Sequence, residues 1–315
     1  MNSPGSGFLV VDKPEGLTSH DVVVRVRQLM KLRRVGHMGT LDPMATGVLP
    51  IAFGKATRLI QFLSEGMKIY HGTIQLGFST STFDREGEPT SIPVTPCFDP
   101  PQLDAISRGM LGEYWQVPPP FSAKKIQGVR AYRLARQGKA PELEARKVWI
   151  YRLVIEKLSA DQISLEIHCT TGTYVRSVAH EIGSKLGCGT HLASLRRLAS
   201  GEFSLERSID LDSMQSLGRD KLGEWVISMN EVLKDLPELL VGAKTMRAFF
   251  HGCDFMSESC LPSSPARPLV RILSENRELL GLAAIKPDQA CIGFKGGEGL
   301  RLQPKVVLIE RGEND

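Results

Sequence analysis

The sequence at residues 36–51 is Gly36-His37-Met38-Gly39-Thr40-Leu41-Asp42-Pro43-Met44-Ala45-Thr46-Gly47-Val48-Leu49-Pro50-Ile51. Glycines at positions 36 and 39 allow positive φ and a close approach of the backbone to a ligand. Pro43 fixes its own φ and biases Asp42 toward an extended conformation. A single carboxylate therefore lies between two rigid stretches of backbone, with the imidazole of His37 five residues upstream. This pattern suits a carboxylate that meets a substrate in one fixed orientation.

An alternative interpretation of the same residues is an ordinary helix start. Asp42 would be the N-cap, Pro43 the first helical residue, and residues 44–49 the short helix. The two interpretations are compatible, because a helix N-terminus also favours an anion. No Gly-Lys-Ser/Thr follows the glycines, and they do not form GxGxxG after a strand, so the sequence does not predict a nucleotide-phosphate cradle.

Length and composition predict a soluble protein of two domains, or one large domain with a small module. The chain has 315 residues, of which 42% are hydrophobic and 23% charged, as in globular proteins. No apolar run approaches the roughly 18 residues of a membrane span, and residues 1–7 lack the features of a secretion signal. We therefore expect a cytoplasmic protein that does not contact a membrane.

The cysteines give no indication of a metal site or a disulfide framework. None of the six belongs to a CxxC motif or shows zinc-ligand spacing with histidine: Cys97, Cys169, Cys188, Cys253, Cys260 and Cys291. Reduced thiols, no metal and no cofactor are the expectation.

Positive charge gathers in two places although the net charge is only +4. Residues 123–147 contain eight Lys or Arg against two Glu, and Arg25, Arg27, Lys31, Arg33 and Arg34 lead into the glycine-rich stretch. From residue 237 onward ten basic residues balance ten acidic ones. Basic clusters around one candidate site indicate a polyanionic partner; the alternative is a solvated helix face.

Hydrophobic periodicity and turn signals predict an α+β protein. Thr18 with Asp21 forms a capping-box signal, and Thr173 is the expected cap of a helix that ends at Gly187. The expected strands are 8–12, 69–78, 147–157, 162–170 and 195–205, and the expected helices are 18–32, 55–63, 101–109 and 173–187.

Two segments stand apart from this pattern. The prolines at 118–120 cannot continue a helix or lie in a central strand, and they introduce the basic segment 123–147, predicted as a mobile insertion that closes over a ligand or as a surface hairpin. From residue 237, short apolar runs alternate with Pro, Gly and Ser clusters, which predicts a small β-rich domain. The predicted domains are therefore 1–236 and 237–315.

The block at residues 36–51 resembles the catalytic motif of the TruB family of pseudouridine synthases. Four further blocks match this family in order along residues 8–205: Leu9-Val10-Val11-Asp12-Lys13-Pro14-Glu15-Gly16, Lys68-Ile69-Tyr70, Gly172-Thr173-Tyr174-Val175-Arg176 and Leu195-Arg196-Arg197-Leu198. The resemblance implies a mixed, largely antiparallel sheet with flanking helices, followed by a small PUA-like RNA-binding domain. It also implies isomerisation of uridine-55 in the T loop of tRNA, without metal or cofactor.

The resemblance further implies a role for individual residues. Asp42 matches the catalytic aspartate, and Lys13-Pro14 a supporting motif. His37 matches a residue that displaces and stacks against the T loop, and Tyr70 the aromatic residue that stacks on the target base. Tyr174, Arg176 and Leu195 match residues of the base pocket. The basic segment 123–147 matches the segment that clamps the T loop.

Each assignment has a structural alternative. Tyr70 is equally typical of a core tyrosine, Arg176 of a solvated surface arginine, and His37 of a loop histidine bonded to backbone. An ion pair of Arg176 with Asp42 would keep the carboxylate ionised. Cys169 is predicted as buried core from the alternation of its strand.

One loop departs from the family pattern. Residues 79–84 align with a loop that carries an additional acidic residue at the position of Ser81, and only Asp84 is retained here. This difference puts the polar contacts around the loop in question.

The expected partner is the T arm of tRNA, bound by a monomer without an obligate protein partner. Two other hypotheses remain open. One is a non-catalytic RNA-binding protein or tRNA folding helper, which would not need Asp42. The other is a guide-RNA-dependent synthase resembling dyskerin, which the absence of a lysine-rich tail disfavours. Attack at C1′ of the sugar, attack at C6 of the base and elimination are all compatible with the sequence.

Overall fold

The computed structural model describes residues 5–121, 125–126, 129–130, 143–257, 269–291 and 299–308. Most of the basic segment 123–147, including Tyr132, lies outside these residues. The described chain forms two β-sheets with flanking helices, and a separate two-stranded ladder joins β6 (Lys125–Ile126) to β7 (Val129–Arg130). The mixed α+β architecture agrees with the sequence-based expectation.

The larger sheet has ten strands in a mixed, largely antiparallel arrangement. Its main path follows the order β12-β1-β3-β10-β4-β9-β8-β5, with β2 paired to β3 and β11 to β10. Among the described strands of this sheet, only the β1/β12 and β3/β10 pairs are parallel. The strands are β1 (Gly7–Lys13), β2 (Val35–His37), β3 (Thr46–Phe53), β4 (Lys68–Leu76), β5 (Gly112–Gln116), β8 (Arg146–Lys157), β9 (Gln162–Cys169), β10 (Thr190–Ser200), β11 (Phe203–Ser204) and β12 (Ser208–Asp210).

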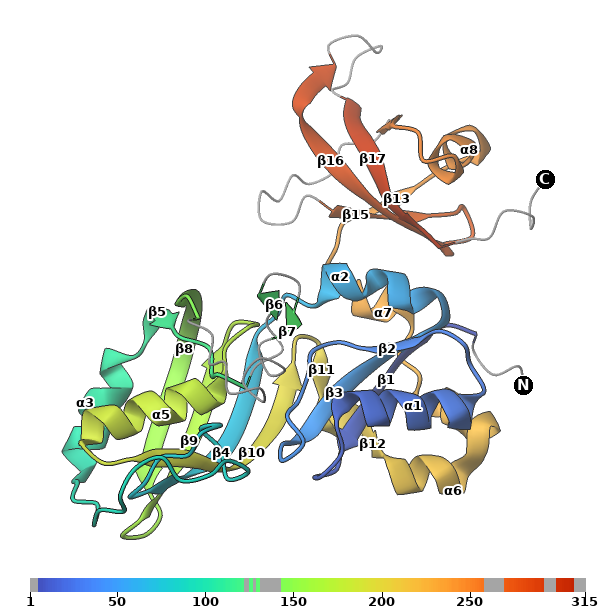
Figure 1. Ribbon diagram of the computed structural model, residues 1–315. Helices are drawn as coiled ribbons and strands as arrows, with labels where there is room; N and C mark the ends of the chain where they lie inside the picture. Colours follow the sequence, from blue (N-terminus) through green and yellow to red (C-terminus); the bar gives the residue numbers. More distant parts are fainter. Residues whose placement is uncertain are drawn as a thin grey trace.

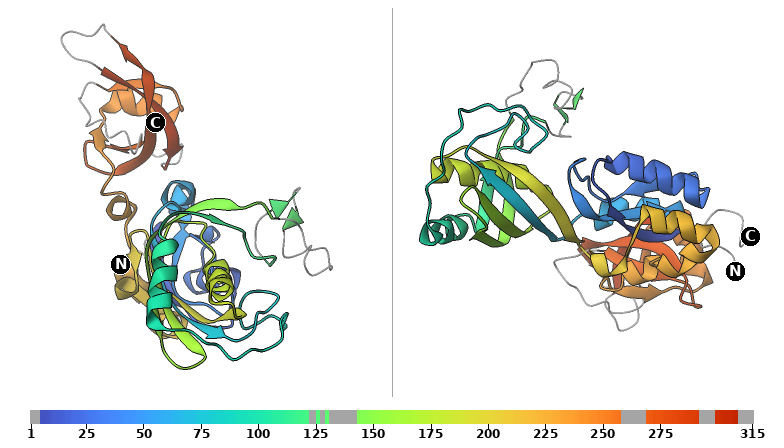
Figure 2. Two further views of the ribbon diagram at one scale, coloured as in Figure 1. Left: turned by 90° about the vertical axis from the view of Figure 1, so that its left-hand side faces the viewer. Right: turned by 90° about the horizontal axis from the view of Figure 1, so that it is seen from below.

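Helices pack on one face of this sheet in two groups (Figures 1 and 2). One group contains α1 (Ser19–Met30) and α6 (Leu211–Lys221), which lie against the β1/β3 half. The other contains α3 (Pro100–Gly109) and α5 (Val175–Leu186), which contact β8 and β10. A single apolar core lies beneath both groups, and this burial is the main stabilising term of the domain.

A five-stranded sheet follows near the C-terminal end, in the order β13-β15-β16-β17-β14. It packs with α8 (Ala243–Phe250) around its own small core and lies above the larger sheet in Figure 1. The strands are β13 (Glu238–Leu240), β14 (Phe255–Ser257), β15 (Leu269–Leu273), β16 (Leu279–Cys291) and β17 (Gly299–Val307).

An apolar cluster joins the two sheets. Phe8 and Val10 on the second face of β1 belong to the same buried cluster as Leu282 and Val306 of the C-terminal sheet. The short α7 (Met229–Val232) contributes Val232 to this cluster. Because β1 alternates between the two faces, its residues contribute to both the helical core and the contact with the C-terminal sheet.

Several predicted elements are confirmed with small differences. The capping box of α1 is present, since Thr18 accepts from the Asp21 backbone and Asp21 accepts from the Thr18 backbone. The expected helix 55–63 begins as a 3₁₀ helix, η1 (Gly54–Leu59), and continues as the single turn α2 (Ile60–Leu63).

Two boundaries were predicted wrongly. The strand expected at 195–205 is β10 from Thr190 to Ser200, because Thr190 and Leu192 pair with Leu76 and Ile74 of β4. A turn at Gly201 then separates it from β11. The N-cap of α5 is Tyr174, not Thr173, whose hydroxyl instead donates to the Thr170 carbonyl.

We predict that Gly47→Ala destabilises the protein far more than a matched glycine substitution. Gly47 has φ 99°, and a Cβ there would lie 2.2 Å from the backbone oxygen of Arg197. Gly112 also has positive φ, 84°, but a Cβ there meets nothing within 4 Å. Gly112→Ala should therefore cost only the left-handed strain of about 1–2 kcal/mol, and Gly47→Ala should cost more because β3 and β10 must separate. Urea unfolding measures both, and equal costs would contradict the prediction.

Candidate active site

Asp42 lies in the connection between β2 and β3, where the chain turns without forming a helix. The Ala45 amide donates to the Asp42 carbonyl at 3.0 Å, and β3 begins directly afterwards at Thr46. The helix-start interpretation of Asp42-Pro43 is therefore wrong. The chain enters β3 at once because residues 47–53 pair along their length with β1, which offers more hydrogen bonds than a short helix.

Glycine conformations make this connection possible at its two ends. Gly39 has φ 101° and Gly47 has φ 99°, which side chains with a Cβ rarely adopt. Gly36 does not use its freedom in this way, since it lies in β2 and pairs with Ala52. A Cβ at Gly39 would be in ordinary van der Waals contact with the side chains of Arg197 and Lys68, so the conformation of Gly39 and not crowding is what favours glycine there.

Hydrogen bonds fix the backbone on both sides of Asp42. The Ser19 hydroxyl accepts from the Leu41 amide at 2.8 Å and donates to the Leu41 carbonyl at 3.1 Å. The Pro43 carbonyl accepts from the Lys13 ammonium at 3.1 Å and from the Gly16 amide at 2.9 Å. Lys13 is fully buried. Burial lowers the pKa of its ammonium to about 8, against the opposing charge of Asp42.

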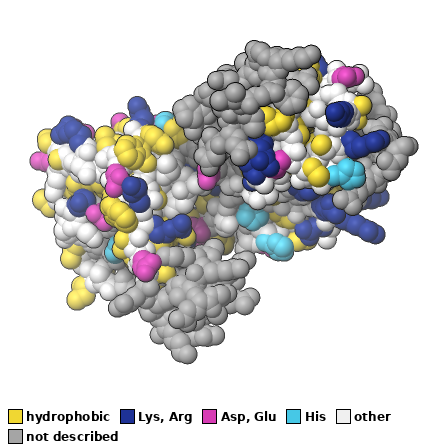
Figure 3. Space-filling view, turned by 90° about the horizontal axis from the view of Figure 1, so that it is seen from above, with side chains coloured by type: hydrophobic (Ala, Val, Ile, Leu, Met, Phe, Trp, Pro, Cys, Tyr) yellow, Lys and Arg dark blue, Asp and Glu magenta, His cyan; other side chains and the backbone are white. Residues whose placement is uncertain are grey.

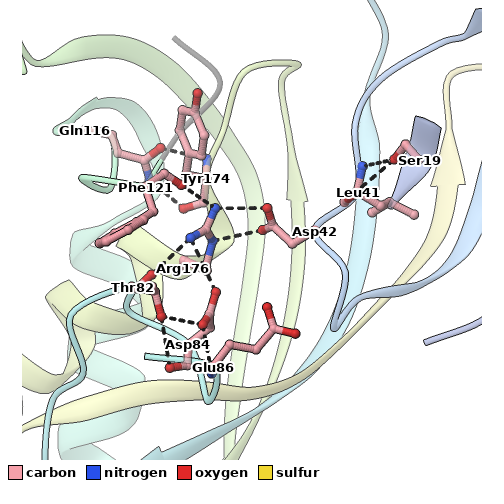
Figure 4. A network of polar contacts seen from close by, with 10 residues as sticks. All are labelled: Ser19, Leu41, Asp42, Thr82, Asp84, Glu86, Gln116, Phe121, Tyr174 and Arg176. Atoms are coloured by element: carbon pink, nitrogen blue, oxygen red, sulfur yellow. Dashed lines mark hydrogen bonds and ion pairs between the residues drawn. The ribbon is translucent and has the colours of Figure 1, made fainter. Parts of the chain in front are cut away.

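Arg176 holds the Asp42 side chain from the first turn of α5. Its Nε lies 2.8 Å from Asp42 Oδ2 and its Nη2 donates to Oδ1 at 2.9 Å (Figure 4). The Nη2 contact is a hydrogen bond and the Nε contact an ion pair without hydrogen-bond geometry, and the two together orient the carboxylate more firmly than one contact would. The Arg176 side chain is only 6% exposed, whereas the Asp42 side chain is 32% exposed. Arg176 is therefore not the solvated surface residue of the alternative interpretation, and the carboxylate remains reachable from outside.

A second carboxylate, Asp84, holds Arg176 from the other side. Asp84 Oδ2 lies 3.3 Å from Arg176 Nη1, and the same nitrogen donates to the Thr82 carbonyl at 3.0 Å. Asp84 is buried and also accepts from the Glu86 amide at 3.0 Å. The sequence analysis noted Asp84 only as retained in its loop. Its partner comes from a helix more than ninety residues away, so local sequence could not identify the pair.

Backbone strain and ring stacking shape the loop that carries Asp84. Phe83 has φ 62°, a conformation rare outside glycine. Its ring stacks on His180 of α5, with centroids 3.9 Å apart and planes inclined by 7°. The stack holds the loop against α5, the helix that also supplies Arg176. It therefore helps to keep Thr82 and Asp84 in contact with Arg176.

Charge and burial set opposing influences on Asp42. Burial raises the pKa of the Asp42 carboxyl above its ordinary value, the charge of Arg176 opposes the rise, and Asp84 adds to it. Arg176, followed by Lys13, therefore favours the ionised form of Asp42.

The other predicted site residues come from strands and ends of elements around Asp42. Tyr70 on β4 and Leu195 on β10 are buried beside the helical core. Tyr174 caps α5, and its backbone amide and carbonyl are both held by the side chain of Gln116 at 2.7 and 3.0 Å. Sequence reasoning missed Gln116, because nothing in its local sequence links it to α5.

His37 lies at the end of β2 with a half-buried ring. Burial lowers the pKa of His37, and the nearby charge of Arg197 lowers it further, so the ring is neutral at pH 7. Its Nδ1 is buried without a hydrogen-bond partner among the described residues. The His37 side chain is nevertheless hydrogen-bonded to the Gly39 backbone, which agrees with the alternative of a loop histidine bonded to backbone.

Cys169 is buried core, as predicted. It is fully buried on β9, and burial raises the pKa of its thiol to about 11.

In the described part of the chain, no three His, Cys, Asp or Glu residues are grouped as metal ligands. Its helices include none that is long and apolar enough to cross a bilayer.

Comparison with known protein families gives two adjacent matches. The model of the TruB family pseudouridylate synthase N-terminal domain matches residues 27–175. The model of the tRNA pseudouridylate synthase B C-terminal domain matches residues 176–240. The two matches together cover more than half of the chain.

Individual relatives agree with these matches. The tRNA pseudouridine synthase B of Solibacter usitatus (strain Ellin6076) is 44% identical over 280 residues, covering 89% of this chain and 95% of the relative. The protein of the same name from Clostridium novyi (strain NT) is 36% identical over 304 residues, covering 96% of this chain and 100% of the relative.

Solved structures show the same fold over nearly the whole chain. A Cbf5-Nop10-Gar1 complex contains a chain with a TM-score of 0.73 and 26% identity, covering 97% of this chain and 85% of that chain. A chain in the archaeal box H/ACA sRNP Nop10-Cbf5 complex has a TM-score of 0.72 and 25% identity, covering 98% of this chain and 88% of that chain.

We predict that the pKa of Asp42 responds in opposite directions to changes at its two charged neighbours. In the wild type it should exceed the ordinary value of 3.8, so protonation begins at a higher pH as the pH falls. Arg176→Gln removes the stabilising cation and should raise the pKa further, whereas Asp84→Asn removes a like charge and should lower it.

Carbon-13 NMR titration of the aspartate carboxyls measures these shifts. Arg196→Gln is the matched control, because Arg196 pairs with a different carboxylate, Asp12, at 2.6 Å. A wild-type pKa at or below 3.8, or a lower pKa in Arg176→Gln, would show that the described charges do not govern Asp42.

Proposed function

The chain belongs to the TruB family of pseudouridylate synthases, and we propose that Asp42 is the carboxylate on which its reaction depends. The enzyme isomerises uridine-55 in the T loop of tRNA to pseudouridine. The C1′–N1 bond is cut, the base turns, and a C1′–C5 bond forms, with C5 losing its proton and N1 gaining one. This sequence needs an ionised carboxylate as nucleophile or base and a pocket that retains the base.

The observation that carries the proposal is the two-point grip of Arg176 on a partly exposed Asp42. Arg176 is itself fixed by Asp84 and by the Thr82 carbonyl, so it cannot follow the carboxylate if the carboxylate moves. Such a carboxylate is oriented before the substrate arrives, so none of the substrate's binding energy is needed to align it.

The neighbouring side chains fit a pocket for an extruded base. A uridine inside a folded loop must leave its stack to reach a buried group. Tyr70 is proposed to stack on the base, an interaction worth about 1–3 kcal/mol, while Tyr174 and Leu195 complete the pocket. His37, neutral at pH 7, is proposed to displace and stack against the T loop. It needs no proton-transfer role.

Basic surface is proposed to hold the phosphates of the T arm. Arg25, Arg33 and Arg34 are exposed on or directly after α1, before the Asp42 connection. Seen from above, several Lys and Arg side chains gather at one edge of the molecule (Figure 3). The segment 123–147 is proposed to clamp the T loop. Phosphate contacts position the RNA, while shape and extruded bases provide selectivity.

We propose residues 1–236 as the catalytic domain and residues 237–315 as the PUA-like RNA-binding domain. The charge of the second domain is balanced, so its contribution is positioning more than phosphate attraction. A monomer without an obligate protein partner, acting in the cytoplasm, is the proposed form.

The guide-RNA-dependent alternative draws on the fold shared with the Cbf5 chains at 25–26% identity. The relatives named tRNA pseudouridine synthase B are more similar, at 36–45% identity, which favours action on tRNA alone. Activity on a bare tRNA transcript without another subunit would exclude the guide-dependent hypothesis.

We predict that Asp42→Asn abolishes tritium release from tRNA labelled at uracil C5, while binding of the tRNA persists. The amide retains the shape of the side chain but cannot act as nucleophile or base, so release should fall by at least about a thousandfold. Asp12→Asn is a matched control, because Asp12 is also ion-paired with an arginine and 29% exposed. Persistent release from Asp42→Asn, or no release from the wild type, would favour a binding protein or folding helper.

We predict that tRNA affinity falls with salt and that Arg33→Gln and Arg34→Gln each reduce the slope. Each phosphate contact contributes about 0.7–0.9 to the slope of log K against log salt. Lys185→Gln serves as the control, because Lys185 pairs with Glu181 on α5 at 3.4 Å. Filter binding between low and moderate salt measures the slopes, and a flat dependence would show that these residues do not contact RNA.

A further inference from the structure

Two cations, Lys68 and Arg197, are buried next to each other below the Asp42 connection. Lys68 is 7% exposed and Arg197 is 0% exposed. A Cβ on Gly39 would lie 3.5 Å from Arg197 Nη1 and 3.8 Å from Lys68 Nζ. Both cations therefore reach the same point of the backbone, three residues before Asp42.

Neither cation forms an ion pair with a carboxylate of the described residues within 4.0 Å. Lys68 donates to the Ser200 hydroxyl at 3.0 Å. Arg197 donates to the carbonyls of Val48 and Gly39 at 2.7 and 3.1 Å, and its side chain is hydrogen-bonded to Tyr70. Buried charges are ordinarily paired, because an uncompensated charge is costly. The unpaired arrangement needs an explanation beyond stability.

The reaction supplies a negative charge at this place. When the carboxylate attacks C1′, or when C2′ loses a proton in elimination, the C1′–N1 electron pair passes to the base, which leaves as an anion. When the carboxylate attacks C6, the electrons of the C5–C6 double bond pass into the O4 carbonyl. The negative charge leaves the uracil when C5 bonds to C1′, after which C5 loses its proton and N1 gains one. All three routes thus place transient negative charge on the uracil.

We propose that Lys68 and Arg197 form a buried cation pair that stabilises this negative charge on the uracil through Tyr70 and the Gly39 backbone. The inference rests on the proposed function, because Tyr70 is the residue assigned to stack on the base. Lys68 and Arg197 are positioning residues that do not touch the base. Charges fixed in advance in a water-excluded site need no rearrangement as the reaction proceeds.

The groups that face Lys68 are consistent with this role. Arg197 approaches from β10 and Cys169 from β9, and burial keeps Cys169 a neutral thiol because its pKa is raised to about 11. Burial, together with the nearby charge of Arg197, lowers the pKa of Lys68 to about 8. Lys68 is therefore charged below about pH 8 and neutral above it.

The test compares Lys68→Met and Lys68→Arg with Arg196→Met under single-turnover conditions on T-arm RNA. Arg196 is the adjacent strand residue, but its side chain is 40% exposed and paired with Asp12. Lys68→Met should lower the rate constant by at least about tenfold, because loss of a preorganised charge slows the chemical step. RNA affinity should stay within about twofold of wild type, because Lys68 does not touch the RNA. Arg196→Met should leave the rate constant within about twofold.

Two further readouts separate a catalytic effect from a structural one. The wild-type rate should fall above about pH 8, and Lys68→Arg should shift this limb to higher pH because a guanidinium stays protonated. Lys68→Met should not lower the unfolding temperature, because it removes an uncompensated buried charge; a purely structural lysine predicts a lower temperature.

An unchanged rate in Lys68→Met, an unmoved alkaline limb in Lys68→Arg, or an equal rate loss in Arg196→Met would overturn the proposal. If Lys68→Met does not fold, the structural role is supported and the proposal fails. These results differ from failure of the proposed function, which would appear as undiminished turnover by Asp42→Asn.

Discussion

The arrangement of this site depends on one buried guanidinium held between two carboxylates. Arg176 on α5 contacts Asp42 from the β2–β3 connection and Asp84 from the loop after β4. These three segments are far apart in sequence, and only the folded sheet and α5 bring them together. Breaking a buried pair by removing one partner is costly, about 3–5 kcal/mol, so the three segments constrain one another. The same constraint that orders the loops also fixes the orientation of the exposed Asp42 oxygens.

Rigidity at Asp42 comes from backbone contacts as much as from charge. Lys13 and Ser19 fix the carbonyls and amide next to Asp42, and Arg197 fixes Gly39. Phe83 adopts a strained φ that the stack with His180 maintains. Strained or uncompensated groups persist only where the surrounding structure determines them fully. Phe83 and the uncompensated cations Lys68 and Arg197 lie around Asp42, whereas Lys31 and Arg277, which also have positive φ, lie elsewhere in the fold.

Local sequence was sufficient for elements whose signals are local. The Thr18–Asp21 capping box predicted α1, and alternation predicted the paired strands β8 and β9, because both signals lie within one element. Asp42-Pro43 is compatible with both a helix start and a tight turn, because both use the same residue types. Only the pairing of β3 with β1 decides in favour of the turn. Asp84 and Gln116 were missed for the opposite reason. Their partners, Arg176 and the Tyr174 backbone, lie in another element, and no pattern within either segment encodes the contact.

The balance of charge around Asp42 explains how one carboxylate serves a polyanionic substrate. Lys13, Lys68, Arg176 and Arg197 are all buried near the Asp42 connection, whereas Asp42 is half-buried, Asp84 is buried and Glu86 is exposed. With all of these groups ionised, the interior of the site carries an excess of positive charge. Burial alone would favour the protonated carboxyl, so the cations are needed to keep Asp42 ionised. The same excess favours entry of a phosphate-bearing strand and of a base that becomes negative during the reaction. One electrostatic arrangement therefore keeps Asp42 ionised, attracts a phosphate-bearing strand and favours a base that becomes negative, which a neutral pocket would not do.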